Sequence, residues 1–240
     1  MYIYGRNPVI EALRSDTTVA KIFIRFGTHG NAVEEVKRHA REHGVQVVEL
    51  PRQKFDRLGN TTDSQGIVAL IEEARLVTLR DLLADVREQD PPFFVAVDGV
   101  TDPRNLGAIL RSAECAGAHG ILLPQRDSSP ITDTVVKTSA GAVAHMAIAR
   151  VGNLHQALEQ LKEEGIWLAG LDAEGETDLL DLDGFRPLCL VVGSEGHGLR
   201  HLTKRTCDTL VRIPMWGHID SLNASVAAAL AMYEIRRKRI

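Results

Sequence analysis

The sequence predicts an α/β protein with a small mixed α/β domain over residues 1–75, a linker over 76–92, and a larger domain over 93–240 built on a parallel, doubly wound sheet. Three observations support this division. The first domain mixes helical periodicity with short β-branched runs. The linker is charged and ends in Pro91-Pro92, which excludes helix and favours extended chain. Beyond it, continuous apolar runs alternate with helical patterns, as in a sheet covered on both faces.

Capping and periodicity predict the elements of the N-terminal domain. Asn7 is a good N-cap and Pro8 suits the first helical position, so a helix is expected from residue 8 to about residue 14. Gly44 stands shortly after a second helical pattern and marks its end. The other expected elements are strands over 19–26, 45–50 and 66–71 and helices over 31–42 and 53–58.

The C-terminal domain is predicted from alternating strands and helices. Its expected strands are residues 93–98, 120–123, 145–151, 166–171, 188–192 and 209–213. Its expected helices are residues 106–116, 132–139, 154–164, 199–207 and 222–237, and the linker carries a short helix over 79–86. This alternation implies a parallel sheet, because parallel neighbours need a crossover connection.

Composition narrows the class of protein. No apolar run approaches the ~20 residues of a membrane-spanning helix. The first residues lack the apolar segment of a signal peptide, so a cytoplasmic location is expected. Cys115, Cys189 and Cys207 are scattered, which predicts reduced, mostly buried thiols. The histidine pairs at 39/43 and 197/201 have helical spacing but no H-E-x-x-H pattern, so no metal is expected.

The net charge of −4 argues mildly against a nucleic-acid partner, although the distribution of charge matters more than its sum. Basic residues gather in three clusters: Arg52, Lys54 and Arg57; Lys37, Arg38 and Arg41; and the run from Arg236 to Arg239. The last run fits a solvated helix end as well as an RNA contact.

Three segments at the carboxyl ends of predicted strands form a candidate ligand site, because open parallel sheets bind ligands beyond those ends. The first is residues 193–198, Gly-Ser-Glu-Gly-His-Gly, between a strand and a helix. Its glycines allow close approach to the backbone, and N–H groups at the helix start can bind acceptors. The spacing G-x-x-G-x-G disfavours a dinucleotide or P-loop enzyme. A turn needed only for geometry is the alternative.

The second segment, residues 213–225, joins a strand to the final helix. Pro214 ends the strand and Gly217 permits a turn. Ser221 or Asn223 can cap the helix, and capping explains both almost as well as catalysis does. The small residues that follow predict close packing of this helix, against the sheet or against another subunit.

The third segment, residues 105–111, follows a turn at Asp102-Pro103, and Asn105 is expected to open a helix there. Arg111 then lies within the helix among apolar residues. An Arg is costly to bury unpaired, so Arg111 has a partner or a role. Glu195 and Glu114 are the candidate partners.

In this order, the three segments resemble the SpoU (TrmH) family of RNA ribose 2′-O-methyltransferases over residues 93–240. Residues 4–13 and the segment 64–67 (Ser-Gln-Gly-Ile) are also similar to the subgroup that methylates a guanosine in 23S ribosomal RNA. The resemblance implies an N-terminal RNA-binding domain with an L30e-like fold, a catalytic domain with a C-terminal trefoil knot, and a homodimer.

The resemblance also implies S-adenosylmethionine as cofactor and no metal. The residues that would hold the cofactor are Gly193, Glu195, Gly196, Ile213, Met215 and Leu222. Arg111 would serve the ribose hydroxyl, and Asn105, Glu195, Ser221 and Asn223 would shape the catalytic site. Because a guanidinium stays protonated, Arg111 is a poor base, and we expect it to act as a fixed cation that stabilises the developing alkoxide.

Two positions depart from the family pattern, since Trp216 and Asp220 stand where small residues are usual. Asp220 would repel RNA phosphates, and Trp216 either stacks on a base or fills an interface. Two alternatives stay open: a transfer-RNA 2′-O-methyltransferase with the same catalytic domain, and a non-catalytic RNA-binding protein of ribosome assembly. The presence of Arg111, Glu195 and Asn223 together favours an enzyme.

Overall fold

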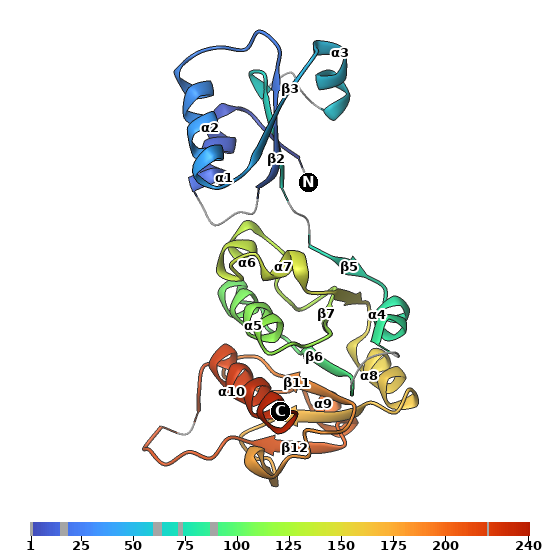
Figure 1. The fold of residues 1–240 in the computed structure, drawn as a ribbon. Coiled ribbons are helices and arrows are strands. Elements are labelled where there is room, and N and C mark those ends of the chain that lie inside the picture. The colour runs from blue at the N-terminus through green and yellow to red at the C-terminus, as the bar shows by residue number, and fades with distance from the viewer. Residues whose placement is uncertain (1, 15–18, 60–63, 72–73, 87–90, 220) are drawn as a thin grey trace. The chain divides into compact units, whose positions relative to one another are not determined.

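The structure is a computed structural model that describes residues 2–14, 19–59, 64–71, 74–86, 91–219 and 221–240. The chain divides into two compact units, Met1–Glu73 and Ala74–Ile240, and each has its own sheet (Figure 1). The predicted α/β class is confirmed, with a mixed sheet in the N-terminal unit and a parallel sheet in the C-terminal unit.

The N-terminal unit is a four-stranded sheet in the order β1-β4-β2-β3. Its elements are β1 (Tyr2–Tyr4), α1 (Arg6–Arg14), β2 (Val19–Arg25), α2 (Asn31–Glu42), β3 (Gln46–Leu50), α3 (Arg52–Phe55), the 3-10 turn η1 (Asp56–Leu58) and β4 (Ile67–Ile71). Strands β2 and β3 are parallel, and the other two pairs are antiparallel. Ile22 and Ile24 of β2 are buried against α1 and α2 in the core of this unit.

The C-terminal unit is an eight-stranded sheet in the order β10-β12-β9-β11-β6-β7-β8-β5, and its strand pairs are parallel. Its strands are β5 (Leu76–Val77), β6 (Phe93–Val97), β7 (Gly120–Pro124), β8 (Ile148–Val151), β9 (Trp167–Leu171), β10 (Thr177–Asp178), β11 (Leu188–Val192) and β12 (Thr209–Arg212). The central strands β11, β6 and β7 are buried at every position, as their continuous apolar sequences predict.

Helices cover both faces of this sheet. They are α4 (Leu79–Val86), α5 (Pro103–Cys115), α6 (Asp133–Thr138), α7 (Ala142–His145), α8 (Leu154–Glu163), α9 (His201–Thr206) and α10 (Ala224–Lys238), with a 3-10 turn η3 (Leu179–Asp181). Apolar residues of α5 and α10 pack on one face, and those of α4 and α8 pack on the other (Figure 1). The two layers make the unit doubly wound, as predicted.

Four helix starts differ from the predictions by two residues or more. Helix α1 begins at Arg6, not at Pro8, so Asn7 lies inside the helix and is not its N-cap. Helix α5 begins at Pro103, because the Asp102 side chain accepts a hydrogen bond from the Arg104 N–H at 2.8 Å and caps it. Asn105 therefore lies inside the first turn and does not open the helix. Helix α10 begins at Ala224, not at residue 222, and α9 begins at His201, not at residue 199.

The strand predicted over residues 145–151 begins only at Ile148, because Ala142–His145 forms α7. Strands β1, β5 and β10 were not predicted. Each has two or three residues and is formed by pairing with a longer strand, as Leu76 pairs with Ile148. The segment expected to be a linker contributes β5 and α4 to the C-terminal unit, where Leu82 is 1% exposed.

The basic residues at the end of α10 bind backbone of the same unit. The Lys238 ammonium donates to the carbonyl oxygens of Leu180 at 2.6 Å and Leu182 at 2.7 Å. The Arg239 guanidinium donates to the Gly184 carbonyl at 2.7 Å and also to the carbonyls of Pro91 and Arg186, and it lies over the Phe93 ring. These two cations therefore hold neighbouring segments of the unit together.

Replacing Arg239 with alanine is expected to lower the free energy of unfolding by about 2–3 kcal/mol, because several charge-assisted hydrogen bonds to otherwise unpaired carbonyls are lost. Arg237→Ala is the matched control, since among the described residues Arg237 pairs only with Glu234, at 2.8 Å on the surface. It should cost less than about 0.5 kcal/mol. Urea unfolding of both variants measures the difference in stability. Equal unfolding midpoints would contradict the stabilising role of Arg239.

The cysteines are only partly as predicted. Cys189 is buried and Cys207 half-buried, but Cys115 is exposed. Burial raises the pKa of the Cys207 thiol to about 12 and that of Cys189 well above its ordinary value, so neither is reactive. Within the described ranges, no helix is long and apolar enough to cross a bilayer.

Candidate functional site

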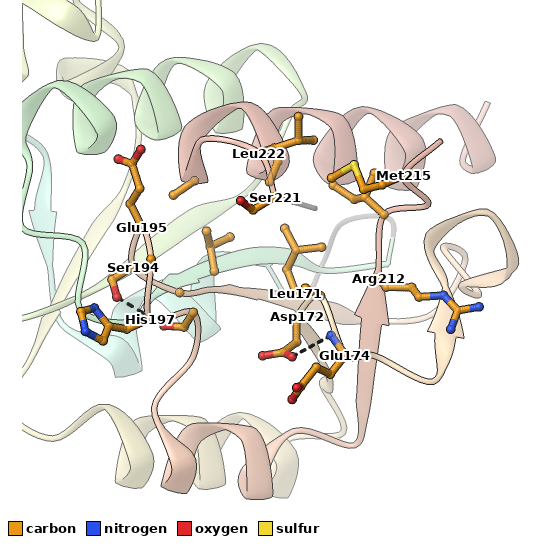
Figure 2. A pocket seen from close by; sticks show the side chains of 18 of the residues that line it. Leu171, Asp172, Glu174, Ser194, Glu195, His197, Arg212, Met215, Ser221 and Leu222 are labelled. Carbon is orange, nitrogen blue, oxygen red and sulfur yellow. Dashed lines mark hydrogen bonds between the residues drawn. The ribbon is translucent and has the colours of Figure 1, made fainter. Parts of the chain in front are cut away.

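A pocket of about 910 Å³ opens where β9, β11 and β12 end (Figure 2). The sequence-predicted cofactor residues line it: Gly193, Glu195, Gly196, Ile213, Met215 and Leu222. Ser221, predicted for the catalytic site, lines it as well. The pocket lies beyond the carboxyl ends of parallel strands, which is where open α/β sheets bind ligands.

Residues 193–198 form a tight loop at one wall of the pocket. The backbones of Ser194 and Gly198 exchange two hydrogen bonds of 3.0 Å, and a Cβ on Gly193 would lie 2.2 Å from the Gly198 carbonyl carbon. Only glycine fits at position 193. The sequence suggested that the N–H groups beside the pocket belong to the start of a helix. Because α9 begins only at His201, these N–H groups belong to the loop instead.

Two buried carboxylates anchor this loop and α9. Asp98, 2% exposed, accepts from the Arg200 backbone N–H at 2.9 Å and pairs with its guanidinium at 3.4 Å. Asp172, 8% exposed, pairs with the Lys204 ammonium at 2.7 Å, and this hydrogen bond raises the pKa of Lys204. The loop is thereby tied to the ends of β6 and β9.

The residues after β9 were missed as pocket residues. Asp172 and Glu174 line the pocket opposite Met215 and Leu222 (Figure 2). The signal was present in the sequence, since Asp172 directly follows a predicted strand at its carboxyl end. The salt bridge to Lys204 depends on tertiary packing and left no sequence signal.

Three of the predicted catalytic residues form one hydrogen-bonded network. The Asn105 amide donates to Glu195 Oε2 at 2.9 Å. The Asn223 amide donates to Asn105 Oδ1 at 3.0 Å and to the same Glu195 oxygen at 3.4 Å. Three segments far apart in the sequence thus meet at one carboxylate. Two amide donors hold that carboxylate in one orientation beside the pocket.

Arg111 does not join this network. Its side chain is exposed, and in the described part of the chain it makes no hydrogen bond or ion pair. The expectation that Arg111 is buried is wrong, because Leu106, Ile109 and Leu110 form the buried stripe of α5 and Arg111 lies outside it. Of the two alternatives left open, a structural partner or a role, neither Glu195 nor Glu114 supplies the partner among the described residues. An exposed cation on this helix is available to a ligand from solvent.

Asn223 has a second task, because its Oδ1 caps α10 by accepting from the backbone N–H groups of Ser225 at 3.0 Å and Val226 at 3.4 Å. Asn223→Ala is expected to cost about 1 kcal/mol of stability and to lower the turnover that the family resemblance implies by roughly tenfold or more. Asn153 caps α8 in the same way, through the Gln156 N–H at 3.3 Å, away from the pocket. Asn153→Ala should cost equal stability with full turnover; equal loss of turnover in both variants would contradict a catalytic role.

The segment before α10 is exposed. Trp216 is 89% and Ile219 76% exposed, and Met215 and Leu222 are partly exposed beside the pocket. Asp220, expected to repel RNA, lies outside the described residues. On α10 itself, Val226, Leu230 and Tyr233 follow one another at helical spacing and are about half exposed.

Comparison with known proteins gives two family matches. Residues 92–233 match the SpoU rRNA Methylase family, and residues 2–77 match a family described as RNA 2′-O ribose methyltransferase substrate binding. The Bacillus subtilis protein YacO, whose name assigns it to the TrmH family of tRNA/rRNA methyltransferases, is 44% identical over 239 residues, which is 99% of this chain and 96% of YacO.

Solved structures give the same picture. An AdoMet-bound rRNA methyltransferase from Sinorhizobium meliloti has a TM-score of 0.66 and 29% identity, with 100% of this chain and 87% of that chain covered. The TrmH/SpoU tRNA modifying enzyme of A. aeolicus has a TM-score of 0.57 and 27% identity, and covers 67% of this chain and 82% of its own.

Proposed function

This chain belongs to the SpoU/TrmH family of RNA 2′-O-ribose methyltransferases, and from that premise we propose that it methylates a guanosine ribose in 23S ribosomal RNA. The enzyme class and S-adenosylmethionine as methyl donor follow from the family and from the AdoMet-bound relative. The choice of ribosomal RNA rests on the full-length match to an rRNA methyltransferase, whereas the A. aeolicus tRNA enzyme covers 67% of this chain. The similarity of residues 4–13 and 64–67 to the guanosine-specific subgroup supports the choice.

The residues of the pocket fit S-adenosylmethionine. The loop of Gly193 and Gly196 offers backbone groups, and Ile213, Met215 and Leu222 offer an apolar wall. Asp172 and Glu174 share the single Lys204 ammonium, at 2.7 Å and 3.9 Å, so one negative charge remains there to suit the positive charge of the cofactor. When bound, S-adenosylmethionine supplies an electrophilic methyl group, so the protein has only to present and deprotonate the ribose hydroxyl.

Arg111 and the Asn105–Glu195–Asn223 network carry the proposed chemistry. The guanidinium of Arg111 is exposed and always protonated, so it can bind the 2′-oxygen of an incoming ribose and stabilise charge that develops there. The proton leaves to another group or to an RNA phosphate. The network, with Ser221, fixes the walls of the pocket while the ribose approaches. The network is the observation that carries the proposal, because a protein that only binds RNA has no need of it.

Homodimerisation and the trefoil knot, both implied by the family, belong to this proposal. The exposed apolar face of α10 supports a second copy as its partner, together with Trp216 and Ile219 in the segment before it. Leu230→Glu is expected to shift the protein to monomer in sedimentation velocity and to lower methyl transfer. Leu202→Glu is the control, since Leu202 is an equally exposed leucine on α9. A dimer that persists in Leu230→Glu would exclude this face of α10 as the dimer interface.

The proposed function is tested by methyl transfer from labelled S-adenosylmethionine to ribosomal and transfer RNA from a strain that lacks the protein. Label on a 23S fragment, lost with Arg111→Ala, is the expected result. Label on transfer RNA would keep the chemistry and move the substrate to the tRNA alternative. Cofactor binding without label on any RNA would indicate an assembly intermediate as substrate, and absence of cofactor binding would favour a non-catalytic RNA-binding protein.

A further inference from the structure

Two of the three basic clusters in the sequence are occupied by contacts within the chain. On α2, Lys37 pairs with Glu49 at 3.0 Å and Arg38 with Glu42 at 3.8 Å. At the end of α10, Lys238 and Arg239 bind backbone carbonyls, as described above. These cations are therefore already engaged by carboxylates or backbone carbonyls of the chain, and binding a polyanion would mean breaking those contacts.

The third cluster is different. Lys54 on α3 and Arg57 on η1 are exposed, and their side chains make no hydrogen bond or ion pair within the described ranges. Arg52 pairs with Asp56 at 3.7 Å, much as Arg38 pairs with Glu42, so Arg52 is not counted among the free cations. This segment of an acidic chain thus presents at least two cations to solvent.

The position of α3 places these cations beside the face of the N-terminal sheet that lies opposite α1 and α2, where Lys21, Phe23 and Arg25 are half-buried. Ile22 and Ile24 of β2 point into the core under α1 and α2, so Lys21, Phe23 and Arg25 point to the other face. The Tyr2 and Phe23 rings lie 6.2 Å apart on it.

Helix α3 lies on this same side (Figure 1). The Tyr4 hydroxyl, two residues along β1 from Tyr2, donates to the Leu58 carbonyl of η1 at 2.9 Å and ties the segment there. The described residues that the four strands place on this face include Lys21 and Arg25 and no Asp or Glu.

We propose that this basic sheet face, made of Lys21, Arg25, Lys54 and Arg57 with the rings of Tyr2 and Phe23, is where the N-terminal unit binds RNA, and that it takes an unpaired stretch. The inference rests on the proposed function and adds the binding surface to it. Cations bind the phosphates of the strand, and rings on an open sheet stack with bases that are not engaged in a duplex.

The test compares two double variants of the full chain, Lys54→Gln/Arg57→Gln and Lys37→Gln/Arg38→Gln, each of which removes two cations from the N-terminal unit. The probe is transcribed 23S ribosomal RNA, and its binding is measured over a range of salt concentrations. At about 0.1 M salt, the first variant should bind about 25-fold more weakly, and its salt slope should fall by about 1.4. The second variant should stay within about twofold of the wild type.

Tyr2→Leu removes one of the two rings without changing any charge, and it should also weaken binding, by about fivefold or more. Binding of S-adenosylmethionine by calorimetry should be unchanged in all three variants. In turnover, the loss should appear in KM for RNA and not in kcat. Equal RNA binding by both double variants would overturn the proposal that RNA binds the basic sheet face.

The two proposals fail separately. Wild-type protein that binds RNA through Lys54 and Arg57 but transfers no methyl group would refute the proposed function and leave the face intact. Methyl transfer to 23S RNA with unchanged KM in Lys54→Gln/Arg57→Gln would support the proposed function and refute the basic sheet face as the RNA-binding surface.

Discussion

Replacing Arg111 with alanine is expected to lower kcat for methyl transfer by about 100- to 1000-fold, the effect of removing one preorganised charge-stabilising group worth about 2.7–4 kcal/mol. Cofactor binding should not change, because Arg111 is exposed on α5 and does not line the pocket. Stability should not change either, since the side chain has no hydrogen bond or ion pair in the described part of the protein. Single-turnover kinetics with saturating RNA measure the chemical step directly.

Arg111→Lys separates charge from geometry. An ammonium keeps the charge but lacks the planar fork of the guanidinium, so most of the loss should persist. Arg205→Ala, an exposed arginine on α9, is the control for removing any surface cation and should keep full kcat. Near-full turnover of Arg111→Lys with intact cofactor binding would refute the specific role of the guanidinium.

Gly193→Ala is expected to abolish cofactor binding, with a loss of at least about 100-fold in affinity. The added Cβ would lie 2.2 Å from the Gly198 carbonyl carbon and 2.4 Å from its oxygen, and these are backbone atoms that cannot move aside without opening the loop. Overpacking of this kind also costs about 1–3 kcal/mol of stability. Calorimetry with S-adenosylmethionine and a thermal melt measure both effects.

Gly152→Ala is the matched control, since a Cβ at that glycine meets nothing within 4 Å. It should bind the cofactor as the wild type does. If Gly193→Ala did so too, the tight loop would not be part of the cofactor site.

The long, buried strands were predictable from their own residues. A continuous apolar run such as residues 93–97 or 188–192 predicts a buried strand whichever strand it pairs with. Strands of two or three residues were not, because they exist only through pairing. The start of α5 was missed although its signal was present: Asp102-Pro103 is an N-cap followed by a first-turn proline, and it was interpreted as a turn.

The candidate site was predictable in part. Its glycines and the two asparagines stand at strand ends and helix starts, where sequence patterns are informative. The exposure of Arg111 was misjudged because its apolar neighbours were counted without their helical phase. The roles of Asp98 and Asp172 depend on Arg200 and Lys204, which fold onto them from α9 and its N-terminal end, so no local pattern indicates them.

The pairing of β6 with β11 has a kinetic consequence. This central pair joins Phe93 to Leu188 and Val97 to Val192, with most of the C-terminal unit between them in sequence. Closing so long a loop is entropically costly and slow. Asn105 follows β6 and Glu195 follows β11, so their hydrogen bond can form only once that loop has closed. During refolding, recovery of methyl transfer should therefore mark the last long-range step, whereas helical signal returns earlier.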